Sequence, residues 1–372
     1  MKNTFFQVVD KGFIWYARKN TRYKIASGPR CIVTDKGEVI CSFMVQTALG
    51  VNNFRPVIVR SHNCRTWSGF TMPWMHLSSK YSIFGSISKS YDGQIFFFGA
   101  RTVIDNPCEL FWSETTQGMK ENGLVYAYSS DEGYTWSELF EIPKPISGAA
   151  EAPGAMCITK NGSWHACYSP YNTFDPNLSV ERNQVVLLTS RDKGKTWLYR
   201  QMFHFEQKYA TAAEAWIIEL SDGRLVGTCW KINQKDGSDF PNPYTISFDD
   251  GNTWTPSKST GIMGQSTALA PLPDGRLLFI YNQRKHPPYG VRLAIANPCD
   301  VDFGIDTDEI VYSVEKPATR FSATSHDDWT NFSFGEPHVI LLGDRILLVV
   351  FWCIEQGVGG IRYVCLEAPG LF

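Results

Sequence analysis

Three glutamates stand at the starts of strand-forming runs: Glu151, Glu214 and Glu336. If those runs are inner strands around one axis, the three carboxylates face a common pocket. Hydrolysis of a glycosidic bond uses two carboxyl groups in different environments, one protonated and one ionised. Each glutamate could instead cap its strand or pair with a neighbouring arginine. The sequence therefore offers carboxylate chemistry and a purely structural alternative.

Polar and aromatic residues are concentrated in the segment 323–338, which leads into the last of these runs. His326, Asp328 and His338 could line the same pocket, and either histidine could transfer a proton. A lone histidine is more often a structural residue, which is the alternative for both. The adjacent residues of the run HDD alternate in direction and make a poor metal cage, so no metal is predicted.

Further side chains near strand ends are candidates for substrate binding. Arginines can hold a carboxylate, and aromatic rings match the apolar CH faces of a sugar, although packing between neighbouring sheets is the alternative for the rings. The long excursion 102–122 is expected to wall one side of the pocket. The predicted substrate-binding residues, beyond His326 and Asp328, are Arg30, Asn52, Arg55, Arg101, Tyr168 and Trp230.

The elements that position these residues follow from a repeat. The pattern Ser-x-Asp-x-Gly-x-Thr-Trp occurs at 129–136, 190–197 and 247–254, with a shortened copy at 61–67. Asp followed two residues later by Gly makes a tight turn, because the carboxylate accepts backbone N–H groups while Gly takes a positive φ. These Asp residues are therefore predicted to be structural. Repeats of about 60 residues have the size of a four-stranded propeller blade.

Six β-rich runs interrupted by a tight turn recur at a similar spacing and predict hairpins. The prediction is an all-β, six-bladed propeller formed by one domain, 1–372, with the N-terminal strand completing the last blade. Hairpin turns and Asp motifs then fall on one face, and the starts of inner strands fall on the other. The candidate residues belong to that second face.

Composition narrows the possible partners. The net charge is −2 and charged residues make up only 19% of the chain, so neither a nucleic-acid nor a membrane partner is predicted. No run could span a bilayer, and the N-terminus lacks a signal-peptide pattern, although a removed signal peptide would leave no trace. Ten cysteines without CxxC spacings favour buried thiols in a cytoplasmic protein. Cys31 with Cys41, and Cys157 with Cys167, are predicted to face each other across hairpins. No cofactor is predicted.

The Asp motifs, the hairpin series and the length resemble the sialidase (neuraminidase) superfamily of Asp-box, or BNR-repeat, propellers, over nearly the whole chain. The resemblance implies an arginine where Ser27 stands and an acid/base Asp in the loop that holds Asn52 and Asn53. It also implies a Tyr nucleophile where this chain has Gly335 and Glu336. Glu214 matches the glutamate that assists that nucleophile. These departures indicate that the chain is not a true sialidase.

The exo-acting arabinanases also resemble this fold and carry two catalytic glutamates on neighbouring blades. That resemblance implies a catalytic pair of Glu214, as nucleophile or base, and Glu151, as general acid, with exchangeable roles. The predicted function is exo-acting hydrolysis of a glycoside or oligosaccharide other than a sialoside. A polysaccharide lyase acting on a uronate-containing glycan is one alternative. A non-catalytic propeller that binds sugar or protein is the other.

Overall fold

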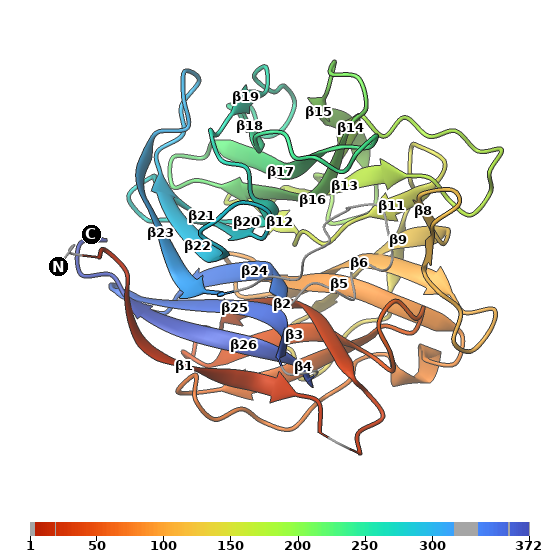
Figure 1. Ribbon diagram of the computed structural model, residues 1–372, viewed down its shortest axis with the longest axis horizontal. Coiled ribbons are helices and arrows are strands. Elements are labelled where there is room, and N and C mark those ends of the chain that lie inside the picture. The colour runs from red at the N-terminus through yellow and green to blue at the C-terminus, as the bar shows by residue number, and fades with distance from the viewer. Residues whose placement is uncertain (1–3, 19, 316–333, 356–357, 372) are drawn as a thin grey trace.

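The chain forms six β-sheets arranged as blades around a central axis (Figure 1). The computed structural model describes residues 4–18, 20–315, 334–355 and 358–371. Each blade is antiparallel, and its strands pair in chain order from the axis to the rim, except that the first strand of the chain forms the outer edge of the last blade. The predicted all-β, six-bladed propeller is therefore confirmed.

The first three blades follow the order of the repeats in the sequence. From axis to rim, their strands are β2 (Ile25–Val33), β3 (Val39–Gln46) and β4 (Arg55–Ser61); β5 (Tyr81–Lys89), β6 (Ile95–Val103), β9 (Asn122–Ser129) and β10 (Phe140–Ile142); and β11 (Ala149–Glu151) with β12 (Cys157–Ile158), β13 (Trp164–Tyr171), β14 (Gln184–Ser190) and β15 (Leu198–His204). A 3-10 helix, η1 (Met75–Leu77), and a small sheet of β7 (Trp112–Ser113) and β8 (Gly118–Met119) lie in the connections.

The last three blades include the first strand of the chain. Their strands, from axis to rim, are β16 (Ala210–Glu219), β17 (Leu225–Asn233), β18 (Pro243–Ser247) and β19 (Lys258–Ser259); β20 (Gln265–Pro271), β21 (Leu277–Gln283), β22 (Gly290–Ala296) and β23 (Ile305–Ser313); and β24 (Phe334–Leu341), β25 (Ile346–Glu355), β26 (Val358–Glu367) and β1 (Gln7–Tyr16). Because β1 pairs antiparallel with β26, the first and the last strand of the chain lie side by side at the outer edge of one blade (Figure 1).

Neighbouring blades pack through their apolar faces. Ile40 of blade 1 and Phe97 of blade 2 lie in one buried cluster, and Phe279 of blade 5 and Phe351 of blade 6 lie in another. All four side chains are at most 1% exposed. Burying an apolar side chain of this size contributes about 1.5–3 kcal/mol, so these contacts between blades hold the ring together.

The Asp motifs close the turns on the face opposite the starts of the inner strands. Asp131 accepts hydrogen bonds from Thr135 N at 2.8 Å, Thr135 Oγ1 at 2.6 Å and Ser129 Oγ at 2.8 Å. Gly133, with φ of 77°, donates its N–H to Ser129 Oγ at 2.8 Å. Equivalent contacts occur in the two other full copies. These contacts give the motif the structural role predicted from the sequence.

One of the two predicted cysteine pairs is wrong. Cys31 lies directly opposite Cys41 in the β2–β3 register, as predicted, but Cys157 lies opposite His165 and not Cys167. The hairpin between β12 and β13 turns one residue earlier than the symmetric placement assumed, which moves its partners by two. All ten cysteines are free thiols. Within the described ranges, no helix is long and apolar enough to cross a membrane.

Candidate active site

Four inner strands carry the same irregularity near their starts. Each strand has a register shift against its hairpin partner, and one residue at the shift has a left-handed backbone. Three of these residues are not glycine, and such a conformation costs about 1–3 kcal/mol, which is typical of functional sites. The four residues are Gly28 (φ 60°), Glu214 (51°), Ser266 (63°) and Glu336 (46°).

A chain of hydrogen bonds joins these residues across five blades. Gly28 N donates to Glu336 Oε2 at 2.7 Å, and Glu336 N donates to Ser266 Oγ at 2.9 Å. Ser266 Oγ in turn donates to Glu214 Oε2. Glu214 N donates to both carboxylate oxygens of Glu151, at 3.1 and 2.9 Å. The three predicted catalytic glutamates therefore belong to one network around the axis.

A glycine is required at the first bulge. A Cβ on Gly28 would lie 3.0 Å from the Phe84 ring, and the positive φ already disfavours other residues. This glycine lets the backbone of blade 1 approach the carboxylate of Glu336. The preceding residue, Ser27, stands where the resemblance to sialidases implies an arginine.

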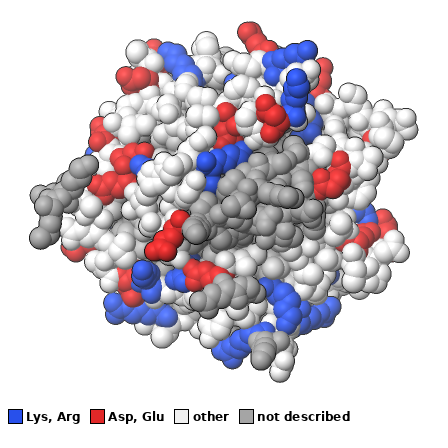
Figure 2. Space-filling view, in the orientation of Figure 1, with Lys and Arg blue, Asp and Glu red and all other residues white. Residues whose placement is uncertain are grey.

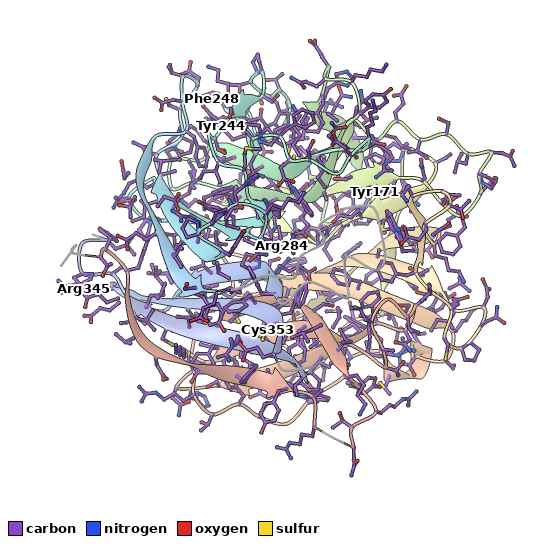
Figure 3. The ribbon with its side chains drawn as sticks, viewed as in Figure 1. Tyr171, Tyr244, Phe248, Arg284, Arg345 and Cys353 are labelled. Atoms are coloured by element: carbon purple, nitrogen blue, oxygen red, sulfur yellow. The ribbon has the colours of Figure 1, made fainter. Side chains whose placement is uncertain are left out.

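The three glutamates line one pocket of about 210 Å³ on the axis. Most of its described wall is apolar or aromatic, and Figure 3 labels two lining residues, Arg284 near the centre of the ring and Tyr171 on β13. Carboxyl groups beside so much apolar surface are poorly solvated, which favours their neutral form. The aromatic side chains of the lining are Phe54, Phe84, Phe111, Trp112, Tyr171, Trp230 and Trp352.

Burial raises the pKa of two neighbouring glutamates, Glu151 and Glu214. Burial and the charge of Glu214 raise the pKa of Glu151 well above its usual range. Burial and the charge of Glu336 raise the pKa of Glu214 to about 7, while the Ser266 hydroxyl and the Arg284 guanidinium oppose the rise. Burial therefore favours the neutral form of both carboxyl groups, and the Ser266 hydroxyl and the Arg284 guanidinium favour the anion on Glu214.

The third glutamate, Glu336, lines the pocket beside two buried arginines. Burial raises the pKa of Glu336, and the positive charge of Arg30 and the Gly28 N–H oppose that rise. Burial also lowers the pKa of the Arg284 guanidinium to about 10, with the charge of Glu214 acting in the other direction. Two buried arginines thus favour the ionised form of the carboxylates on blades 4 and 6.

Arg30, predicted to bind substrate, lies behind the pocket. Its guanidinium donates to three backbone carbonyls, those of Pro29 at 2.8 Å, Glu336 at 3.2 Å and Pro153 at 3.3 Å. It also lies over the Trp216 ring, 5.0 Å from the centroid, and the residue is 1% exposed. These contacts place its charge beneath the glutamates and outside the described pocket lining.

His338, predicted to be catalytic, is also buried behind the pocket. Its Nδ1 accepts the Cys31 N–H at 3.3 Å, and its ring stacks on Trp216 with the centroids 5.6 Å apart. Burial, together with the charge of Arg30, lowers the pKa of His338 to about 3. A ring that stays neutral, is fixed by packing and lies outside the described lining does not suit proton transfer to a substrate.

The remaining predicted residues divide between the pocket and the scaffold. Asn52 and Trp230 line the pocket, and Asn52 Nδ2 donates to Val103 O at 2.9 Å. Arg55 and Arg101 are held elsewhere, Arg55 by the carbonyls of Phe54, Ser78 and Tyr81, and Arg101 by an ion pair with Glu141. Tyr168 is 1% exposed and packs in the core between blades 2 and 3. His326 and Asp328 lie outside the described residues.

The excursion 102–122 walls one side of the pocket, as predicted. Thr102, Phe111, Trp112, Met119, Lys120 and Asn122 belong to the lining. The Lys120 ammonium is neutralised by two carboxylates, with Nζ 2.6 Å from both Asp105 Oδ2 and Glu109 Oε1.

Sequence reasoning missed Ser266, which connects two of the glutamates. A positional signal could have found it, because Gly28, Glu214 and Ser266 each precede a hairpin-turn glycine by nine residues, namely Gly37, Gly223 and Gly275. Across the described ranges, no group of three or more His, Cys, Asp or Glu side chains could hold a metal ion. Acidic and basic side chains are interspersed over the described part of the face in Figure 2.

Six blades, Asp-box turns and an axial pocket define a sialidase-like β-propeller. The family model for the BNR repeat-like domain matches residues 102–328, which is more than half of the chain. The chain belongs to this BNR repeat-like family. No curated protein matches the sequence.

Solved structures with the same fold cover almost the whole chain. A protein of unknown function from Dyadobacter fermentans is 21% identical, with a TM-score of 0.73 over 98% of this chain and 99% of that chain. The NanB sialidase of Streptococcus pneumoniae is 14% identical, with a TM-score of 0.66 over 96% and 70%. An intramolecular trans-sialidase from Ruminococcus gnavus, in complex with oseltamivir carboxylate, is 14% identical, with a TM-score of 0.64 over 96% and 97%.

Proposed function

We propose that this propeller is an exo-acting glycoside hydrolase for a sugar other than sialic acid, with Glu151 as general acid and Glu214 as base or nucleophile. The observation that carries the proposal is the placement of these two carboxyl groups in one apolar pocket with different electrostatic surroundings. Paired carboxyl groups whose pKa values are pushed apart can divide the acid and base roles of glycoside hydrolysis between them.

The environments of the two groups support this division of roles. The ionised form of Glu214 is stabilised by the Ser266 hydroxyl, by Arg284 and by Arg30. The negative charge of Glu214 favours the protonated acid on Glu151, and the Glu214 N–H opposes this effect. A proton can thus be given to a leaving oxygen from Glu151 while Glu214 acts as the anion.

Glu336 completes the site as a positioning group in this proposal. Its N–H and its carboxylate connect the bulges of blades 5 and 1. Its negative charge helps to raise the pKa of Glu214 to about 7, which is close to neutral pH. The aromatic walls provide surfaces on which the CH faces of a sugar ring can stack.

The proposal is tested by activity on a panel of aryl glycosides and oligosaccharides, followed by release of reducing sugar and by ultraviolet absorbance. We expect reducing sugar without absorbance, and a loss of at least about 100-fold in kcat for Glu151→Gln and Glu214→Gln. Glu206→Gln, at an exposed position outside the described pocket lining, is the matched control and should keep full activity. Unsaturated products that absorb would instead identify a lyase.

A non-catalytic, sugar-binding propeller is the second candidate. It is favoured by the hydrogen-bond chain itself, in which Glu151 and Glu336 act as acceptors for backbone N–H groups of neighbouring blades. Carboxylates used in this way can serve the architecture alone. Saturable sugar binding without turnover, on the same panel, would support this candidate and refute the hydrolase.

A further inference from the structure

The described pocket lining contains more carboxyl groups than cationic side chains. The described lining holds three carboxylates, Glu151, Glu214 and Glu336, and two cationic side chains, Lys120 and Arg284. The Lys120 ammonium lies 2.6 Å from each of two further carboxylates at the pocket wall. Its charge is therefore compensated before any ligand enters.

The arginines that sequence analysis assigned to a substrate carboxylate are held by other groups. The Arg30 guanidinium donates to backbone carbonyls behind the pocket, as described above, and lies over Trp216. Arg55 caps loop carbonyls, and Arg101 pairs with Glu141 over the Tyr81 ring. All three lie outside the described lining, so they do not form a clamp for an anionic group.

Arg284 lines the pocket, but its surroundings already balance its charge. Its guanidinium lies over the Trp230 ring, 5.5 Å from the centroid, and donates to Phe334 O at 3.4 Å. The negative charges of Glu214 and Asp239 stabilise it. An incoming carboxylate would have to compete with Glu214 for this guanidinium, and the two anions would repel each other at short range and low dielectric.

We propose that the axial pocket binds an uncharged sugar unit, not a uronate or a sialate, with sugar hydroxyls hydrogen-bonded to the three glutamates and CH faces lying against the aromatic walls. Carboxylates are hydrogen-bond acceptors that suit hydroxyl donors. Anionic sugars are disfavoured because the two cationic side chains of the described lining, Lys120 and Arg284, are already balanced by carboxylates of the protein. This inference deepens the proposed function, because it names the class of sugar that the hydrolase acts on.

Binding of matched sugar pairs tests the inference without any need for turnover. Titration calorimetry on the full chain would compare the methyl glycosides of galactose and galacturonic acid, and of glucose and glucuronic acid, in both anomeric forms. The members of each pair differ only by CH₂OH in place of a carboxylate. N-acetylneuraminic acid and a broad set of neutral monosaccharides and disaccharides complete the panel. We expect neutral sugars to bind and the uronate of a binding pair to bind at least ten-fold more weakly.

Two variants test whether charge in the pocket, and not the shape of the pocket, causes the difference in affinity between a neutral sugar and its uronate. Glu214→Gln removes an ionisable carboxyl group from the pocket and should reduce the difference in affinity between the neutral sugar and its uronate. Glu206→Gln should leave this difference unchanged. Tighter binding of a uronate or of N-acetylneuraminic acid, abolished by Arg284→Gln, would overturn the inference. Failure to bind any neutral sugar of the panel would also overturn it. A neutral sugar that binds but is not cleaved would refute the hydrolase and leave this inference standing.

Discussion

Replacement of Ser266 by alanine gives a quantitative test of the hydrogen-bond chain around the axis. Ser266 Oγ donates to Glu214 Oε2 and accepts the Glu336 N–H at 2.9 Å, and the residue is fully buried. A hydrogen bond to a charged group is worth about 1.5–3 kcal/mol, and a change of one in pKa corresponds to about 1.4 kcal/mol. The pKa of Glu214, which is about 7 in the wild type, should therefore rise by about one to two.

The assay is the pH dependence of kcat/KM on an aryl glycoside. If Glu214 must be ionised, the acidic limb of the profile should move from about 7 to about 8–9. A carbon-13 NMR titration of the glutamate carboxyl groups measures the same change without turnover, and it applies whether or not the chain is a hydrolase. The Glu336 N–H loses its acceptor, which should also cost about 1–3 kcal/mol of unfolding free energy.

A second variant distinguishes the hydroxyl from backbone strain. Ser266 has φ of 63°, a conformation that alanine tolerates no better but glycine adopts freely. Ser266→Gly should therefore recover part of the lost stability while it shows the same rise in the pKa of Glu214. An unchanged or lowered pKa of Glu214 in both folded variants would refute the role assigned to the hydroxyl.

Two further predictions concern stability. Because the pKa of Glu214 is raised in the folded state, from 4.5 to about 7, the folded protein binds more protons than the unfolded chain between these values, so stability should fall as the pH rises through this range. The loss should be up to about 3 kcal/mol in the wild type and smaller in Glu214→Gln, as measured by urea unfolding at pH 5 and pH 8. Asp131→Ala should lower the free energy of unfolding by about 1–2 kcal/mol, because the variant loses the hydrogen bonds that hold the pKa of Asp131 at about 2. This value is reduced for solvent screening because Asp131 is exposed. In the wild type, the contribution of Asp131 to the free energy of unfolding should disappear as the pH falls from about 4 towards 2. Sugar binding on the opposite face should be the same in the variant and the wild type. A variant with full stability, or with altered binding, would contradict the structural role of the motif.

The sequence predicted the architecture because the signals that encode it are local. A carboxylate that accepts N–H and hydroxyl groups within its own turn, as Asp131 does, depends on residues two to four positions away. The Gly turns between paired strands are equally short-range, and their repetition fixes the number of blades. The same topology places the starts of inner strands on one face, so the convergence of three glutamates could be predicted from their positions alone.

Contacts between blades were decided by the tertiary structure. The sequence contains Arg30 and His338 at strand starts, but the bulges change which way neighbouring residues point, and both side chains end behind the pocket against Trp216. The pairing register also depends on where each hairpin turns. The turn between β12 and β13 comes one residue earlier than expected, so His165, and not Cys167, lies opposite Cys157.

The protonation of the glutamates also depends on long-range packing. Glu214 is flanked by Glu151, Ser266 and Glu336, which come from three other blades. The burial of the Glu214 carboxyl group and the charges around it come from residues that lie far apart in the sequence. The sequence by itself determined that carboxylates stand at the axis of a propeller. The packing of the blades decided how far these carboxyl groups are buried and which arginines lie beside them, because those properties arise only when distant strands meet.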